Sequence, residues 1–245
     1  DLIIFSAAIK SDNVERAEAK RRGIPELERS EALGQLTEGY ESVVGIAGCH
    51  GKTTITSMLA LICEQGGPDA TVHIGGCVDF LNGGVRIGAH DMFITEACEY
   101  VESFLTLRPT IALINNIDND HLDYYGDMEH IVAAFKKFAA LLPENGLLIG
   151  NTDDFRVRAL MAEHTGRKLS YGMKDADYTP ANTTYDDNGC PGFDIMFRGE
   201  KLMHIQLRIP GEHSVMNAIA AAAVALYIVS FFFCFVSFLF AFFFF

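Results

Sequence analysis

Apolar residues along the chain recur with two different spacings, and segments of the two kinds alternate. Short apolar runs between polar or glycine-containing segments are typical of buried strands, and apolar residues three or four positions apart are typical of helices. This pattern predicts strands at residues 2–8, 24–29, 42–48, 91–96, 109–116 and 145–151, and helices at residues 11–23, 31–42, 52–67, 128–142 and 211–227.

The first forty residues predict a strand, a helix and a second short strand. Leu2 to Ala8 is a continuous apolar run and is predicted to be a buried strand. The helix after it has Ser11 or Asp12 as its candidate N-cap and ends at Gly23. This order is typical of the end of a βαβ arrangement.

Alternating strands and helices predict a mainly parallel sheet with helices packed on it. The Asn82-Gly83 dipeptide predicts a hairpin. Residues 192–211 alternate apolar and polar positions around an Arg-Gly-Glu-Lys turn, which predicts an antiparallel hairpin at the sheet edge. The predicted fold class is therefore α/β, with a P-loop-type, mainly parallel sheet flanked by helices.

The segment GIAGCHGKTT, residues 45–54, joins a predicted strand to a predicted helix. The N–H groups of such a loop and of the following helix N-terminus face an anion. Lys52 would supply a charge for the β- and γ-phosphates, and the Thr53 hydroxyl is a ligand type for Mg²⁺. The usual P-loop spacing requires a glycine at position 46, where Ile46 stands. The segment still predicts a nucleotide site, with unusual glycine positions.

Three further candidates lie near strand ends, where parallel sheets bind their ligands. Glu96 ends one predicted strand, and His121 lies just beyond another. Alone, Glu96 would be a solvated charge and His121 a structural or exposed histidine. Their shared position favours a functional interpretation, because Mg²⁺ prefers oxygen ligands such as carboxylates. Glu99 is a weaker candidate for the same neighbourhood.

His213 and Asn217 are one helical turn apart and share a face of the last predicted helix. An Asn side chain both donates to and accepts from an adenine edge. Without other information, the pair would be interpreted as a helix cap or a packing motif.

The composition of the chain limits the kinds of partner and the cellular compartment that we expect for the protein. The formal net charge of -13 argues against nucleic acid as the main partner, because phosphate backbones need a basic surface. The 6 cysteines have no CxxC spacing, which predicts reduced thiols in a cytoplasmic protein. The chain begins within a strand pattern and without Met, so the N-terminus is expected to be cut.

Residues 228–245 are apolar and rich in Phe. The run is long enough for a short transmembrane helix, but it lacks flanking Lys or Arg and Trp. Apart from Ala241, residues 227–245 are all types encoded by TTT or by a codon one base away. We therefore expect an artefactual tail read from T-rich DNA, with a membrane anchor as the alternative.

Four segments resemble, in order and spacing, the signature segments of the Mur ligases. They are GCHGKTT, EACEYVESFL, NNIDNDHLDYYG and PGEHSVMNAIAAAAVA. The resemblance covers residues 1 to about 227. The family's loop is a shortened G-x-x-G-K-T form whose first glycine is Gly48, so no glycine is expected at position 46. Cys98 stands where many relatives carry Asp, and no role is assigned to it.

The resemblance implies an ATP-dependent ligase, and the segments are most similar to those of members that join L-alanine to UDP-N-acetylmuramate in peptidoglycan synthesis. The implied reaction passes through an acyl phosphate. The implied site residues are Gly48, Cys49, His50, Gly51, Lys52, Thr53, Thr54, His213 and Asn217 for ATP, Thr53, Glu96 and His121 for Mg²⁺, and Lys52, Glu96 and His121 for catalysis.

The family has three domains, so the resemblance also implies a domain organisation. Residues 1–41 would be the remnant of a Rossmann-like domain that binds the UDP substrate, and 42–227 the central ATP-binding domain. The third domain would be absent, so the chain alone is expected to be inactive. The alternatives are a nucleotide-binding fragment without turnover and a related ligase that adds another amino acid or peptide.

Overall fold

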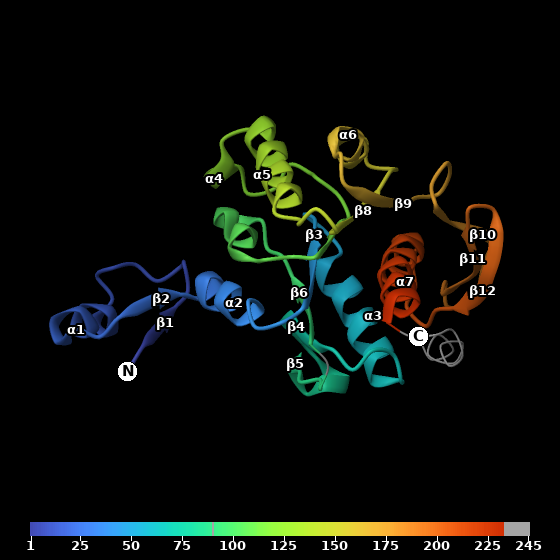
Figure 1. The fold of residues 1–245 in the computed structure, drawn as a ribbon. Helices are drawn as coiled ribbons and strands as arrows, with labels where there is room; N and C mark the ends of the chain where they lie inside the picture. The colour runs from blue at the N-terminus through green and yellow to red at the C-terminus, as the bar shows by residue number, and fades with distance from the viewer. Residues whose placement is uncertain (90, 233–245) are drawn as a thin grey trace.

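The computed structural model describes residues 1–89 and 91–232 (Figure 1), so most of the predicted Phe-rich tail lies outside the described residues. The strands are β1 (Ile3–Phe5), β2 (Glu26–Glu28), β3 (Ser42–Ala47), β4 (Thr71–Val78), β5 (Gly83–Arg86), β6 (Met92–Glu96), β7 (Ile111–Ile114), β8 (Leu147–Asn151), β9 (Arg167–Tyr171), β10 (Tyr178–Tyr185), β11 (Pro191–Phe197) and β12 (Glu200–Gln206). The helices are α1 (Val14–Arg22), α2 (Arg29–Thr37), α3 (Lys52–Glu64), η1 (Asp79–Leu81), η2 (Tyr100–Thr106), α4 (Leu122–Tyr125), α5 (Met128–Ala140), α6 (Phe155–Glu163) and α7 (Glu212–Phe232).

Ten strands form one sheet in the order β12-β11-β10-β9-β8-β7-β3-β6-β4-β5. The pairs from β10 through β9, β8, β7, β3 and β6 to β4 are parallel. The pairs β10–β11, β11–β12 and β4–β5 are antiparallel. The predicted α/β class, the mainly parallel sheet and both hairpins are therefore confirmed.

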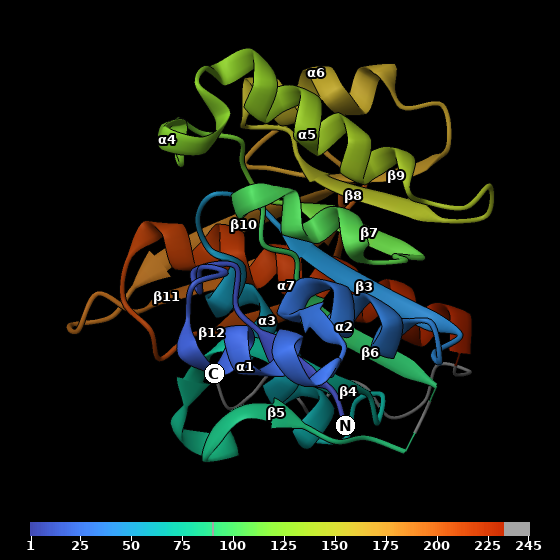
Figure 2. The same cartoon turned by 90° about the vertical axis from the view of Figure 1, so that its left-hand side faces the viewer.

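Helices cover the two faces of the sheet with two separate apolar cores. On one face, α3 and α7 pack with residues such as Ile46, Ile94 and Leu113. On the other, α5, α6 and η2 pack against Ala47, Ile114 and their neighbours. Figure 2 shows α5 and α6 together on that second face. Every residue of β3 is buried, as expected for a strand covered on both sides.

The apolar stripe predicted for α3 is the face that enters the first core. Its members Ile55, Met58, Leu59, Ile62 and Cys63 are all buried. The apolar pattern of the sequence did not predict α6, β9 and β10. Strands β9 and β10 carry polar residues at many positions, as in the sequence YTPANTTY of β10. Their pattern therefore does not indicate burial.

The N-terminal unit is a separate two-stranded parallel sheet, β1–β2, with α1 between its strands. The predicted βαβ arrangement is confirmed, but two details were wrong. The first strand is short and not buried, since Leu2 and Ile4 are 52% and 56% exposed. The N-cap of α1 is Asn13, whose side chain accepts from the Glu15 and Arg16 N–H groups. Gly23 ends the helix in the left-handed conformation, as predicted.

Helix α2 joins this unit to the large sheet by packing closely against η2. The Thr106 hydroxyl donates to the Ser30 carbonyl at 2.8 Å. A Cβ atom added at Gly34 would lie 2.4 Å from the Thr106 carbonyl oxygen. Only a residue without a side chain therefore permits this approach.

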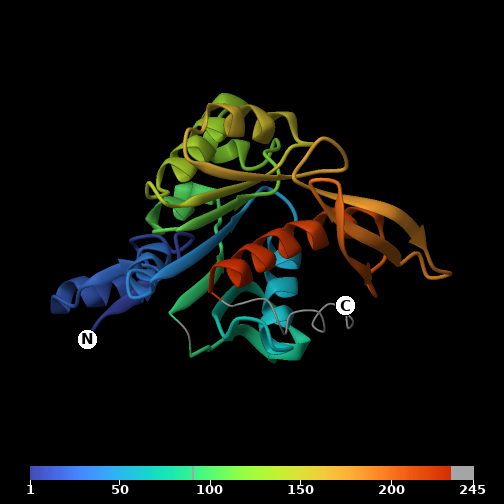
Figure 3. The ribbon, with the colours of Figure 1, turned by 45° about the vertical axis from the view of Figure 1, so that its right-hand side comes forward.

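Three strands and the last helix form the C-terminal part of the fold. Figure 3 shows β10, β11 and β12 projecting from one end of the molecule, with α7 running beside them. The buried Asp194 carboxylate of β11 binds the Lys201 Nζ at 2.8 Å and the His204 Nδ1 at 2.7 Å, both from β12. By length and composition Glu212–Val229 could cross a membrane, but 72% of this segment is buried inside the molecule. This burial is typical of a core helix.

The close contact between α2 and η2 predicts that a single methyl group added at Gly34 destabilises the protein. Gly34→Ala should lower the free energy of unfolding by about 1–3 kcal/mol, because the added Cβ overpacks against backbone atoms that have no room to move. Gly39→Ala is the matched control, since its Cβ would make only an ordinary contact at 3.7 Å. Urea unfolding measures both variants, and equal stabilities would contradict the packing described here.

Candidate nucleotide site

Strand β3 lies between β6 and β7, and the three strands run parallel. Their carboxyl ends therefore meet at one edge of the sheet. The chain leaves β3 toward β4 on one side, whereas β7 pairs on the other side, so this edge is a topological switch point. Ligands of open α/β sheets bind at such a point.

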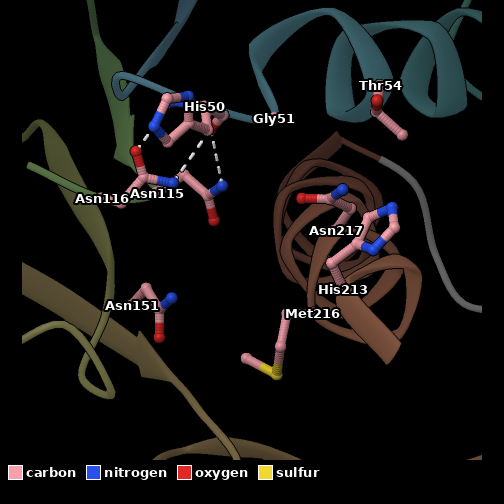
Figure 4. Close-up of a pocket in the computed structure, with 9 residues that line it drawn as sticks. All are labelled: His50, Gly51, Thr54, Asn115, Asn116, Asn151, His213, Met216 and Asn217. Atoms are coloured by element: carbon pink, nitrogen blue, oxygen red, sulfur yellow. Dashed lines mark hydrogen bonds between the residues drawn. The ribbon is translucent and has the colours of Figure 1, made fainter. Parts of the chain in front are cut away.

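The loop between β3 and α3 is tied to the residues that follow β7. The His50 N–H donates to the Asn116 Oδ1 at 2.8 Å, and the Cys49 N–H donates to the Asn116 carbonyl. The amides of Asn115 and Asn116 donate to the His50 carbonyl at 2.9 and 3.0 Å (Figure 4). These bonds hold the loop against the residues that follow β7.

The glycines of this loop have conformations that other residues rarely adopt. Gly48 has φ +140° and Gly51 has φ +86°. A Cβ at Gly51 would lie 2.6 Å from the Asn115 Nδ2 and 2.7 Å from the Asn217 Oδ1. Gly51 is also the N-cap of α3 and offers no side-chain cap. The first N–H groups of α3 are thus left for an anion, as the sequence predicted.

A buried tyrosine that sequence analysis missed holds Asn115 in place. The Tyr171 hydroxyl, at the end of β9, donates to the Asn115 Oδ1 at 2.6 Å. Tyr171 is fully buried, and burial raises the pKa of its hydroxyl well above the ordinary value, so it remains a donor. No local pattern could link these two residues, which are 56 positions apart.

A cavity of about 390 Å³ lies beside the loop, between the strand ends and α7. Figure 4 shows His50, Asn115 and Asn116 on one side and His213, Met216 and Asn217 on the other. Its lining residues are His50, Gly51, Thr54, Asn115, Asn116, Asn151, His213, Met216 and Asn217. The structure therefore brings His213 and Asn217 to the loop predicted for the nucleotide, although they are about 160 residues away in sequence.

Thr53 and Glu96 form a second group at the same edge. The Thr53 hydroxyl donates to the Glu96 Oε2 at 3.2 Å, and the Gly75 N–H, on β4, donates to the Glu96 Oε1 at 2.8 Å. A hydroxyl and a carboxylate at this distance are the oxygen donors that Mg²⁺ prefers.

Lys52 and His121 belong to a third group, centred on Glu99. The Lys52 Nζ lies 2.8 Å from the Glu99 Oε2, and the His121 Nε2 lies 3.5 Å from the Glu99 Oε1. Glu99, a weaker candidate from the sequence, is only 1% exposed. The carboxylates nearest to His121 are thus those of Glu99 and Asp120, and Glu96 binds Thr53 instead.

The third group has the donors for a divalent cation. One ligand atom from each of Glu99, Asp120 and His121 lies within 4.8 Å of the others. Two carboxylates and an imidazole form a donor set that divalent cations accept. His121 adopts a left-handed backbone conformation with φ 55°, and its N–H donates to the Asp120 Oδ1. The Tyr100 ring, 4.7 Å from the His121 ring, also packs against it.

Two cysteines near the loop differ in their surroundings. The Cys49 side chain enters the second apolar core, its Sγ accepts from the Asp118 N–H, and burial raises its pKa to about 11. Cys49 therefore anchors the loop as a neutral thiol, and a nucleotide would meet only its backbone. Cys98 is exposed between Glu96 and Glu99.

The comparisons with known proteins agree with this architecture. Residues 46–225 match the family model of the Mur ligase middle domain. The match covers more than half of the chain, so the chain belongs to the Mur ligase family. Mur ligases are ATP-using enzymes, which fits a phosphate loop at this sheet edge.

Individual relatives show how much of a whole enzyme the chain spans. It is 45% identical over 224 residues to UDP-N-acetylmuramate–L-alanine ligase of Alkaliphilus metalliredigens, covering 91% of this chain and 49% of that protein. The crystal structure of UDP-N-acetylmuramate-alanine ligase from Thermotoga maritima matches with a TM-score of 0.78 and 25% identity, over 93% of this chain and 51% of that one. The crystal structure of UDP-N-acetylmuramate:L-alanyl-gamma-D-glutamyl-meso-diaminopimelate ligase from Neisseria meningitides matches the fold with a TM-score of 0.82 at 23% identity, over 99% of this chain and 76% of that one. The chain thus spans about half the length of the curated relatives it matches.

Removal of the Tyr171–Asn115 hydrogen bond should destabilise the protein, although Tyr171 itself lies outside the loop. Tyr171→Phe leaves the buried Asn115 Oδ1 without its donor, which should cost about 1–3 kcal/mol of unfolding free energy. Hydrogen exchange at residues 48–52 should also become faster. Tyr185→Phe removes a hydroxyl from a residue that is 50% exposed and serves as control. Unchanged stability and exchange in Tyr171→Phe would show that Asn115 does not depend on this hydroxyl.

Proposed function

We propose that the chain is the nucleotide-binding part of an ATP-dependent ligase that joins L-alanine to UDP-N-acetylmuramate. The observation that carries the proposal is the meeting of the Gly48–Thr54 loop, Glu96 and the Glu99–His121 group at one sheet edge. The 45% identity to the Alkaliphilus metalliredigens enzyme supports the substrates, since that protein is named for them.

The nucleotide would lie across the loop and the cavity. Its phosphates would accept from the N–H groups at the start of α3, with Lys52 supplying positive charge. Adenine would occupy the cavity, where Asn217 donates and accepts and His213 lies one helical turn away. A cavity of about 390 Å³ is within the range of ligand pockets.

The residues that would hold Mg²⁺ form two sets. Thr53 and Glu96 suit an ion bound to the phosphates, and Glu99, Asp120 and His121 suit a second ion. Bound Mg²⁺ offsets negative charge on the transferring phosphoryl group. Lys52 would do the same from the loop.

The proposed reaction has two steps, and Lys52 of this chain would act in the first. The muramate carboxylate oxygen forms a bond to the γ-phosphorus, and the bond to the β–γ bridging oxygen breaks, which releases ADP. The alanine amine then attacks the acyl carbon, loses a proton, and phosphate leaves with the former carboxylate oxygen. Charge-assisted bonds from Lys52 stabilise the phosphoryl oxygens in the first step.

We also propose the division of the chain and its compartment. Residues 1–41 would belong to a domain for the UDP substrate and residues 42–227 to the ATP-binding domain. Helix α7 continues to Phe232 with Ile228 and Val229 buried, so the boundary predicted at residue 227 falls within this helix. The separate β1–β2 sheet supports the first boundary. Cytoplasmic placement is supported by the five cysteines in the described part of the chain, all of which are free thiols.

The proposal is tested by the release of ADP from ATP. Because the matched relatives are about twice as long, the assay uses a chimera in which residues 1–227 of this chain replace the matching segment of the Alkaliphilus metalliredigens enzyme. UDP-N-acetylmuramate and Mg·ATP should give ADP only when L-alanine is added, and Lys52→Ala should stop the reaction. This chain alone should release no alanine-dependent ADP. Release driven by another amino acid or by a tripeptide, and not by alanine, would contradict the proposed substrate.

A further inference from the structure

The ammonium group of Lys52 is fully occupied within the protein. Its Nζ donates to the Gly48 carbonyl, to the Cys49 carbonyl at 3.4 Å, and to the two Glu99 oxygens at 3.0 and 2.8 Å. An ammonium group has three protons, so these four acceptors leave none for a phosphate. The residue that should bind phosphate is therefore turned back onto its own loop and onto Glu99.

Glu99 is held where it is by more than Lys52. The carboxylate is buried, and the Tyr125 hydroxyl donates to the Glu99 backbone carbonyl. A buried carboxylate requires a compensating charge, because water does not solvate it. In the structure, Lys52 provides that charge from one side, and His121 lies within 4 Å on the other.

The same carboxylate belongs to the donor set of Glu99, Asp120 and His121. A divalent cation bound there would neutralise Glu99 in place of Lys52. It would also repel the ammonium, since like charges at these distances disfavour each other. Lys52 and the cation thus compete for one carboxylate, and the loss of Lys52 from Glu99 leaves its protons free for a phosphate.

We propose that Glu99 is a positioning residue that holds Lys52 away from the phosphate site until a divalent cation takes its carboxylate. The inference rests on the proposed nucleotide site. It predicts that cation and nucleotide favour each other's binding through Lys52, in addition to the direct contact between metal and phosphate, and such coupling is reciprocal.

The test is a double-mutant cycle on this chain without metal. Calorimetry in EDTA measures ADP binding to the wild type, Glu99→Gln, Lys52→Met and the double variant. Glu99→Gln should bind ADP about tenfold more tightly, because Lys52 gains a charge-assisted bond to phosphate. This gain in ADP affinity should vanish when Lys52 is also replaced by Met. A gain caused only by the loss of a negative charge would persist in the double variant.

Glu102→Gln is the matched control for charge. It removes a carboxylate three residues from Glu99 in sequence, but one that binds the Lys137 Nζ at 2.7 Å rather than Lys52. Its effect on ADP binding in EDTA should be small and the same with or without Lys52. A gain for Glu99→Gln that persists in the double variant, or no gain at all, would overturn the proposal.

A second experiment measures how Lys52 affects the binding of the cation, with Mn²⁺ alone as the probe. Lys52→Met should bind Mn²⁺ about tenfold more tightly than the wild type, since the competitor for Glu99 is gone. Glu99→Gln should lose this Mn²⁺ binding, and weaker or equal Mn²⁺ binding by Lys52→Met would also overturn the proposal.

If the wild type binds neither Mg·ATP nor ADP, the proposed function itself fails. If it binds them and the cycle shows no coupling, only the role of Glu99 is wrong.

Discussion

The parallel pairing of β3 with β6 and β7 determines where the Gly48–Thr54 loop, Glu96 and Asn115 lie. The register places Ile46 opposite Glu96 on one side, and Ala47 opposite Ile114 on the other. The loop after β3 therefore begins at the level where β6 ends and Asn115 leaves β7. Both faces of β3 are buried, so a shift in register would expose core residues and is strongly disfavoured.

At this edge of the sheet, hydrogen bonds between polar groups hold the loop in the shape that a phosphate would meet. Asn115 and Asn116 bind the backbone of His50, and Tyr171 orients Asn115 from two strands away. The loop thus keeps its shape through side chains of other elements, while the first turn of α3 has no side-chain cap. A phosphate would meet donors that need no rearrangement, with the exception of Lys52, which Glu99 binds.

Much of this arrangement could be predicted from the sequence, because local patterns carry it. The loop between β3 and α3, the buried face of α3, both hairpins and the strand-end positions of Glu96 and His121 all follow from short segments. Long-range contacts could not be predicted in this way. Asn115–Tyr171 depends on the pairing of β7, β8 and β9, and no pattern around Glu99 shows that it is buried. The first strand was predicted to be buried from its apolar run, but β1 pairs only with β2, so Leu2 and Ile4 stay exposed.

The central claim is that the Gly48–Thr54 loop binds ATP phosphates through Lys52, and a calorimetric titration of Mg·ATP tests it most directly. The wild-type chain should bind, and Lys52→Ala should lose at least about tenfold in affinity, because a charge-assisted bond to phosphate is worth about 1.5–3 kcal/mol. Arg208→Ala, which removes an exposed cation outside the site, should leave the affinity unchanged. Equal affinity for Mg·ATP in wild type and Lys52→Ala would contradict the account.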